Sequence, residues 1–236
     1  LIAETGNRDI FIECADLTLL AETRALAERL QKRFENIDVL VNNAGALYNR
    51  REITSEGNEK SLAILLLSPF LLTELLLPRL RATAAKNGQA RIVNVSSGGM
   101  YTQPMFLNDL QYEKGDYDGP KAYARAKRGL VAVTERWAKD EAANNIVVNA
   151  MHPGWAATPG VSNSSPAFEK KMRERLRTPE QGADTIIWLA AAVDAGKASG
   201  KFWMDRRPRP TAVFPKTALG DERASTLYDR LKGMVL

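Results

Sequence analysis

The stretch DVLVNNAG, residues 38–45, decides the fold class. A short apolar run, Val39–Asn42, ends on a turn of small residues that closes with Gly45. The run has the length and β-branched content of a buried strand. Glycine at its end lets the backbone approach a flat group closely. Taken alone, the stretch is equally an ordinary turn, so its neighbours along the chain decide the interpretation.

Working outward, helical patterns alternate with strand-like runs, which predicts an α/β fold with a parallel sheet. The expected strands are Ile10–Cys14, Val39–Asn42, Ile92–Val95 and Ile146–Ala150, with Gly200–Met204 as a final edge strand. The expected helices are Leu20–Phe34, Glu59–Ala85 with a kink at Pro69, Lys121–Ala143, Pro179–Ala192 and Asp221–Lys232. The Pro-rich piece Arg206–Pro215 is expected to be a surface loop, and no linker divides the chain, so we predict a single domain over residues 1–236.

Composition narrows the class of protein. The 236 residues are 44% apolar and 26% charged, enough for one substantial core. A single cysteine, Cys14, and a single histidine, His152, exclude a disulfide framework and predict no metal site, and His152 is expected to be a packing residue. The net charge of +5 is spread along the chain, which argues against nucleic acid as a partner. No apolar run reaches the roughly 18 residues of a membrane span, and no targeting segment is visible, which favours the cytoplasm.

Three polar side chains have the spacing of an acid/base site. Ser97 follows the strand Ile92–Val95, while Tyr123 and Lys127 stand four residues apart at the start of a helix and therefore share a face. An ammonium beside a phenol favours the phenolate and lowers the tyrosine pKa from about 10. The serine would then hold the substrate oxygen.

Two other pairs have the same spacing and have to be excluded. Tyr117 and Lys121 are separated by Gly119-Pro120, so they are not expected to share a helical face. Tyr228 and Lys232 lie in the charged C-terminal helix without a nearby serine-ended strand, so a solvated surface pair is expected there. Tyr123 and Lys127 are therefore the predicted pair.

Polar and small residues also follow the other strands. Asp16-Leu17 comes after Ile10–Cys14, and Pro153-Gly154 with Thr158 comes after Ile146–Ala150. Open α/β sheets bind ligands at the carboxyl ends of their strands, where the Asp16 carboxylate can accept from an adenine amino group. Alone, Asp16 is more often a helix N-cap, and the Pro153-Gly154 pair a strand-ending turn.

Asp16, NNAG at 42–45, Ser97, Tyr123-x-x-x-Lys127, and Pro153-Gly154 with Thr158 together resemble the short-chain dehydrogenase/reductase family. The 26-position spacing from Ser97 to Tyr123 is similar to its retinol-dehydrogenase-like branch. The resemblance implies a Rossmann-type, doubly wound parallel sheet. It also implies an NAD(P)-dependent oxidoreductase that interconverts a carbonyl and an alcohol. Tyr123 would exchange the proton, Lys127 would lower its pKa and contact the nicotinamide ribose, and Ser97 would orient the substrate.

The same resemblance implies the cofactor and its contacts. NAD or NADP is expected, with NADP favoured; Asp16 would touch the adenine and Thr158 the carboxamide. The full set of expected cofactor-binding residues is Asp16, Leu17, Asn43, Ala44, Gly45, Tyr123, Lys127, Pro153, Gly154 and Thr158.

The chain departs from the family pattern at two places. An Asn that completes a proton relay in the family aligns with Leu65, which neither donates nor accepts, so a slowed or rerouted relay is expected. The family's first strand, its TGxxxGxG turn and its second strand would precede Leu1, so we expect a piece of a longer protein. Without those strands, Ile10–Cys14 loses its neighbours, and an unpaired strand edge is costly.

The substrate class rests on apolar residues. The segment between Tyr48 and Pro78, with Met100, Phe106 and Trp155, indicates a small hydrophobic substrate, although core packing explains these residues equally well. The alternative function is a non-catalytic binding scaffold, a homodimer formed through Leu62–Leu77 and Lys121–Ala143. A third alternative is an unstable fragment with no independent role.

Overall fold

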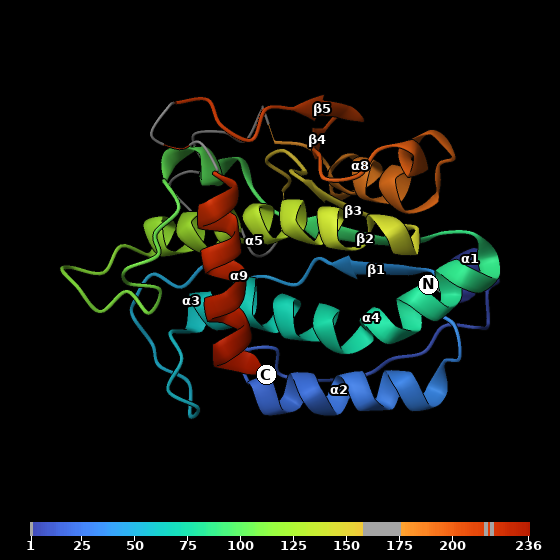
Figure 1. Cartoon of the computed structure of the whole chain (residues 1–236), viewed down its shortest axis with the longest axis horizontal. Helices are drawn as coiled ribbons and strands as arrows, with labels where there is room; N and C mark the ends of the chain where they lie inside the picture. The colour runs from blue at the N-terminus through green and yellow to red at the C-terminus, as the bar shows by residue number, and fades with distance from the viewer. Residues whose placement is uncertain (1, 158–175, 215–216, 218–219) are drawn as a thin grey trace.

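A β-sheet with helices packed around it forms the centre of the molecule (Figure 1). The structure is a computed structural model that describes residues 2–157, 176–214, 217 and 220–236. Within those residues one five-stranded sheet has the order β1-β2-β3-β4-β5, parallel from β1 to β4, with β5 antiparallel to β4. The strands are β1 (Val39–Asn42), β2 (Ala90–Val95), β3 (Ile146–Met151), β4 (Phe202–Met204) and β5 (Arg207–Arg209). The predicted α/β class with a parallel sheet is confirmed.

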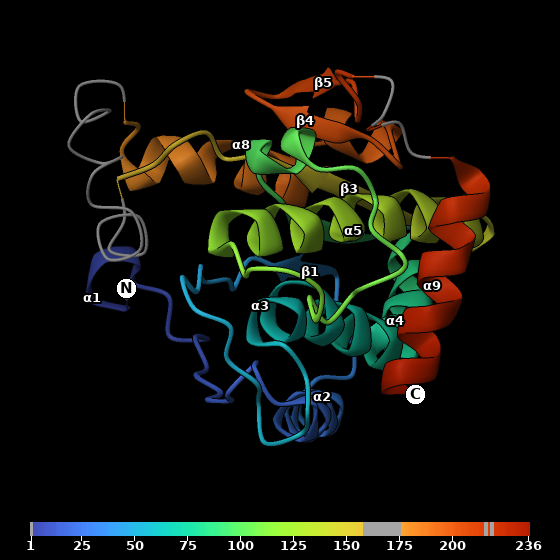
Figure 2. The ribbon, with the colours of Figure 1, turned by 90° about the vertical axis from the view of Figure 1, so that its left-hand side faces the viewer.

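Helices cover both faces of this sheet. The described helices and helical turns are α1 (Ile2–Thr5), α2 (Leu20–Arg33), α3 (Lys60–Leu62), the π-helical turn Ala63–Leu67, α4 (Ser68–Asn87), the 3-10 turn Gly98–Thr102, α5 (Gly119–Asp140), the 3-10 turn Ala142–Asn144, α8 (Pro179–Ala191), the 3-10 turn Asp194–Lys197, and α9 (Asp221–Val235). Figure 2 shows α8 and α4 on opposite sides of the sheet, and both views place α2 outside α4.

Alternation along β2 divides the core into two parts, because successive strand residues point to opposite faces. Ile92 packs into the large cluster formed with α4 and α5, whereas Val93 and Val95 pack with Leu189 of α8 and Trp203 of β4. Both faces of the central strands are therefore buried, as expected for a parallel sheet.

The continuous helix Lys60–Asn87 is apolar because it lies inside the fold. By length and composition it resembles a membrane span, but 67% of its apolar window is buried in the protein, as in a core helix. Its π-helical turn, Ala63–Leu67, ends just before Pro69. Proline has no N–H with which to continue the α-helical hydrogen bonds, which accounts for the irregularity there.

The expected strand Ile10–Cys14 is wrong, because this segment has no regular secondary structure and pairs with no strand among the described residues. Phe11 and Ile12 are 53% and 83% exposed. The segment is held to α2 instead: Glu13 forms ion pairs with Arg29 and Arg33, each at 2.8 Å. A β-branched run becomes a strand only where a neighbour offers its backbone groups.

The C-terminal part of the sheet also differs from expectation. β4 was expected to be an edge strand, but Arg207–Arg209 pairs with it as β5, within the predicted loop Arg206–Pro215. The turn between the strands places Asp205 and Arg206 at a φ of 55° each. Aspartate tolerates this conformation, but arginine is not typical of it and the turn contains no glycine, so the sequence carried no clear hairpin signal.

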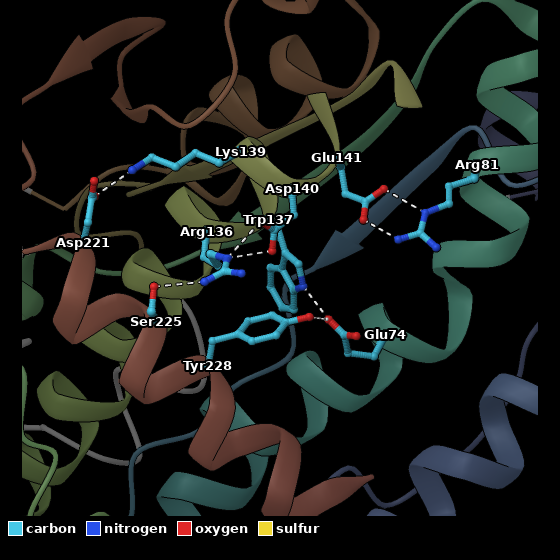
Figure 3. Close-up of polar contacts among 10 residues, drawn as sticks. All are labelled: Glu74, Arg81, Arg136, Trp137, Lys139, Asp140, Glu141, Asp221, Ser225 and Tyr228. Atoms are coloured by element: carbon cyan, nitrogen blue, oxygen red, sulfur yellow. Dashed lines mark hydrogen bonds and ion pairs between the residues drawn. The ribbon is translucent and has the colours of Figure 1, made fainter. Parts of the chain in front are cut away.

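Helix α9 is fastened across α4 and α5 by apolar and polar contacts (Figure 3). Ala224, Leu227, Leu231 and Val235 form its buried stripe. Glu74 of α4 accepts hydrogen bonds from the Trp137 indole at 2.6 Å and from the Tyr228 hydroxyl at 2.8 Å.

Tyr228, expected at the surface with Lys232, instead packs edge-on against Phe70, with ring centroids 5.1 Å apart. Its prediction as a solvated residue is wrong, and its exclusion as the acid/base tyrosine is supported by the bond of its hydroxyl to Glu74 of α4.

We expect Glu74→Ala to lower the free energy of unfolding by about 2 kcal/mol, because it leaves the Trp137 and Tyr228 donors without their acceptor. Urea unfolding followed by circular dichroism measures the change. Glu28→Ala, on the exposed surface of α2, is the matched control and should change the value by less than about 0.5 kcal/mol. Equal effects of the two variants would show that Glu74 does not hold α9 in place.

Candidate active site

Segments far apart in the chain meet at the carboxyl edge of β1, β2 and β3. The Asn43–Gly45 turn follows β1, Ser96-Ser97 follows β2, and His152-Pro153-Gly154 follows β3. The registers Asn42↔Asn94 and Val95↔Met151 align the ends of these strands. The predicted edge is therefore formed as the parallel arrangement requires.

Two buried asparagines hold this edge together: Asn42, which opens the NNAG motif, and Asn94, which the sequence analysis did not single out. The Asn42 amide donates to the Thr73 hydroxyl at 3.0 Å and to the Asn94 side-chain oxygen at 2.8 Å. The Asn94 amide in turn donates to Thr134 of α5 at 2.8 Å. The available signal was Asn94 itself, since a polar residue inside an apolar strand has to be hydrogen-bonded when buried.

Helix α5 brings Tyr123 and Lys127 beside Ser97. Asp118 caps the helix by accepting from the Lys121 backbone N–H at 2.9 Å, and a proline stands in the first turn. The Ser97 side chain lies close enough to the Tyr123 hydroxyl to favour its ionised form. The Lys127 ammonium lies 5.9 Å from the centroid of the Tyr123 ring. The structure thus brings the three predicted side chains together.

The rejected pair lies apart from this site. Tyr117 precedes the first residue of α5, and its hydroxyl donates to Glu59 at 2.9 Å. Burial, which is the larger effect, raises the pKa of Tyr117 to about 12. Its separation from the helix confirms the reason for excluding it.

Burial dominates the electrostatics of the site. It raises the pKa of Tyr123 above its usual value, with the hydrogen bond from Ser97 acting in the opposite direction. The expectation that Lys127 lowers this pKa is not met, because burial and the Ser97 side chain are the effects that act on the phenol and burial is the larger. Burial also lowers the pKa of Lys127 to about 8. The Lys127 ammonium donates to the Val95 carbonyl at 2.6 Å.

Residues 1–168 match the sequence profile of the family described as short chain dehydrogenase. The chain belongs to this family. It is 42% identical over 219 residues to human Dehydrogenase/reductase SDR family member 12, covering 92% of this chain and 67% of that protein. It is 31% identical over 246 residues to mouse Retinol dehydrogenase 13, covering 99% of this chain and 71% of that protein.

A solved structure supports the fold assignment. The complex of Pseudomonas aeruginosa RhlG with NADP is 27% identical, with a TM-score of 0.62 over 80% of this chain and 72% of that one. The curated relatives are longer: the chain spans 67% of the human protein and 65% of the bovine one. This short-chain dehydrogenase is an oxidoreductase of the retinol-dehydrogenase-like branch, with a Rossmann-like fold.

The residues expected to bind the cofactor are distributed along the same edge. Asn43, Ala44 and Gly45 are exposed after β1, and a side chain at Gly45 would come within 2.9 Å of Leu65 and 3.6 Å of the Lys127 ammonium. The backbone there therefore lies close to Lys127, and only glycine leaves this space open.

Asp16 precedes α2 in a short turn. Its carboxylate accepts from the Thr18 backbone at 2.9 Å and from the Thr18 hydroxyl at 2.7 Å, which lowers the pKa of Asp16. Asp16 is exposed and Leu17 is half-buried. The alternative role of Asp16 as a helix N-cap is wrong, because the N-cap of α2 is Leu19 and Asp16 closes a turn ahead of it. The exposed carboxylate remains accessible to a ligand.

The third strand ends in the Pro153-Gly154 turn. Gly154 is buried at a φ of 80°, a region that favours glycine. Thr158, the expected carboxamide contact, lies outside the described residues.

His152 is buried, and burial together with the nearby Arg177 charge lowers its pKa to about 4. The imidazole is therefore neutral near pH 7 and lies against Gly98, which agrees with a packing role.

The residues present fit the nicotinamide cofactor that the family implies. Lys127 makes one described hydrogen bond with an ammonium that has three N–H donors, so donors remain for hydroxyl groups. The open space at Gly45 lies beside that ammonium. Both features are typical of a surface on which a flat ligand can lie.

Leu65 occupies the position beside this ammonium. It is fully buried in the π-helical turn, next to the space at Gly45 that also borders Lys127. A leucine there offers no hydrogen bond, in agreement with the expected gap in the relay.

The depressed pKa of Lys127 predicts a specific pH dependence. The folded chain releases this proton near pH 8, whereas the unfolded chain holds it up to about pH 10.5, so wild-type stability rises with pH in that window. Relative to Lys127→Met, the wild-type free energy of unfolding should increase by about 3 kcal/mol from pH 7 to pH 11.

Urea unfolding of both proteins at a series of pH values measures this difference. Lys232→Met removes an exposed lysine and should show no such trend. A flat difference for Lys127→Met would mean that the ammonium is solvated in the folded chain.

Proposed function

We propose that this chain is an NAD(P)-dependent oxidoreductase that interconverts a carbonyl and an alcohol on a small hydrophobic substrate. The single observation that carries the proposal is that Ser97, at the end of β2, lies close to the Tyr123 side chain of α5, with Lys127 buried one helical turn away. The coenzyme, when bound, supplies or accepts the hydride. The proposed supports for it are Asp16, Leu17, the Asn43–Gly45 backbone, Lys127, Pro153 and Gly154.

The protein's own groups handle the proton. In the reducing direction the Tyr123 hydroxyl donates to the carbonyl oxygen, and Ser97 donates a hydrogen bond to the same oxygen. The Lys127 ammonium stabilises the phenolate that remains, since an opposite charge favours the ionised form. The raised pKa of Tyr123 keeps the proton on the phenol until a substrate oxygen accepts it.

Among the residues that suggested a hydrophobic substrate, Trp155 gives the most direct support, while Phe106 is half-buried with the Arg125 guanidinium 3.8 Å from its ring centroid. Met100 and most of the apolar residues from Leu62 to Leu77 are buried in the core, which favours packing as their role. Trp155 is 45% exposed and follows the Pro153-Gly154 turn directly. An exposed indole at the sheet edge can cover an apolar substrate.

The second candidate is a non-catalytic scaffold, which Leu65 favours. In that function α4 and α5 would form a homodimer. Against it, α9 packs on both helices, with Leu227 and Leu231 buried there. The complete Ser97, Tyr123 and Lys127 set also favours the catalytic candidate.

Tyr123→Phe should reduce turnover by at least about 100-fold, because the proton donor is lost, while affinity for the coenzyme stays within about twofold. Titration with NADPH and with NADH, followed by nicotinamide fluorescence and calorimetry, measures affinity and decides the preference; we expect NADPH to bind more tightly. Aldehyde and ketone panels measure turnover. A folded wild-type chain that binds neither coenzyme would favour the scaffold, and retained turnover would remove Tyr123 from the acid/base role.

Leu65→Asn should raise the turnover rate by about tenfold if proton exchange through Lys127 limits it. Asparagine at this buried position costs stability, so the assay is run well below the melting temperature. Leu65→Ala is the control for lost volume and should not raise the rate. An equal rate for Leu65→Asn and wild type, with both folded, would show that the relay is not limiting.

A further inference from the structure

The turn between β4 and β5 is held in an unfavourable conformation. Asp205 and Arg206 both have a φ of 55°, in the left-handed region that costs a non-glycine residue about 1 kcal/mol. Such backbone strain persists where surrounding contacts fix it. Two ion pairs provide these contacts, one from each residue of the turn.

The first ion pair reaches the candidate active site. Arg177 binds Asp205 in a two-pronged contact, with Nη1–Oδ1 at 2.5 Å and Nη2–Oδ2 at 3.0 Å. The same Nη1 donates to the Pro153 carbonyl at 3.3 Å. The guanidinium therefore joins the β4–β5 turn to the turn that ends β3. A guanidinium and a carboxylate joined by two hydrogen bonds fix each other's orientation in addition to pairing their charges.

Arg177 also fills the space that a side chain at residue 154 would need. A Cβ on Gly154 would lie 2.5 Å from the Arg177 Nε and 2.7 Å from its Cδ. The arginine thus lies directly against the Gly154 backbone. This contact explains the glycine in addition to its φ of 80°.

The backbone of Arg177 pairs with the residues that follow the same turn. The Ala157 N–H donates to the Arg177 carbonyl at 2.8 Å, and the Arg177 N–H donates to the Trp155 carbonyl at 2.7 Å. Main chain and side chain of one residue therefore hold the segment Pro153–Ala157 from two sides.

We propose that Arg177, oriented by Asp205, is a positioning residue that fixes the Pro153-Gly154 turn and thereby the nicotinamide end of the coenzyme site. The inference rests on the proposed function, since it assigns that turn to the coenzyme. Arg177 does not touch the reacting atoms; it acts through the backbone that it holds.

The second ion pair of the same turn supplies a matched control. Arg206 forms a two-pronged contact with Asp184 of α8, including Nε–Oδ2 at 2.8 Å. This pair braces the same strained turn but points to α8 instead of Pro153. Loss of either arginine removes one partly exposed ion pair, so the free energy of unfolding should fall by a similar amount in both variants.

The test compares Arg177→Gln, Asp205→Asn, the double variant and Arg206→Gln. Titration with NADPH and NADH should show affinity weakened about tenfold in the first two, since small displacements of a positioning element have large effects. The double variant should be no weaker than the weaker single variant, because both changes break one contact. Arg206→Gln should stay within about twofold, and turnover at saturating coenzyme should be similar in all four.

Amide hydrogen exchange separates this inference from the proposed function. The Ala157 and Arg177 amides should exchange faster in Arg177→Gln than in Arg206→Gln. If wild type binds neither coenzyme, the proposed function fails, and the exchange rates alone decide whether Arg177 holds the turn. Affinity that falls equally in Arg177→Gln and Arg206→Gln, or equal exchange in both, would overturn the positioning role.

Discussion

Parallel pairing of β1, β2 and β3 is the constraint on which the rest of the structure depends. It brings the ends of three strands to one edge, and with them a glycine turn, a serine and a Pro-Gly turn that are far apart in the sequence. The Asn42–Asn94–Thr134 hydrogen bonds then link that edge to α5. Because Tyr123 and Lys127 belong to α5, the register of the sheet and the position of the acid/base pair are fixed together.

Burial at this edge changes the chemistry of the same side chains. Lys127 is 3% exposed and has a carbonyl, not a carboxylate, as its described partner, so its charge is poorly compensated. The resulting pKa of about 8 lies close to neutrality, where a lysine can both hold and release a proton. Tyr123 responds in the opposite direction, since loss of solvent disfavours its anion. The pKa values of the two neighbours, 10.0 for tyrosine and 10.5 for lysine in their usual surroundings, therefore move apart, and the phenol keeps its proton in the resting site.

The sequence was sufficient where chemistry follows from local spacing. Tyr123 and Lys127 share a helical face by their four-residue spacing, and Ser97 ends a strand that is recognisable by its β-branched residues. It was insufficient where a partner distant in the chain decides the outcome. Ile10–Cys14 has strand composition but no strand beside it in the described part of the chain, and β5 forms through a turn that contains Arg206 at a positive φ. The pKa of Tyr123 depends on burial by the whole fold, which spacing does not encode. No sequence motif pointed to Arg177, because its contacts with Pro153 and Asp205 arise only in the folded chain.

Burial of Lys127 also changes the effect expected of the nearby Leu65. If the Lys127 ammonium kept its usual pKa, it would rarely release its proton near neutrality. Loss of a polar neighbour would then leave that proton with no partner to which it could pass. Here burial lowers that pKa to about 8, so the ammonium loses its proton readily near neutrality. Leu65 is itself fully buried beside the space at Gly45 that also borders Lys127, so it keeps this region apolar while it offers no hydrogen bond. The substitution thus has two opposing effects on proton exchange, and the rate depends on whether the lower pKa compensates for the lost hydrogen bond.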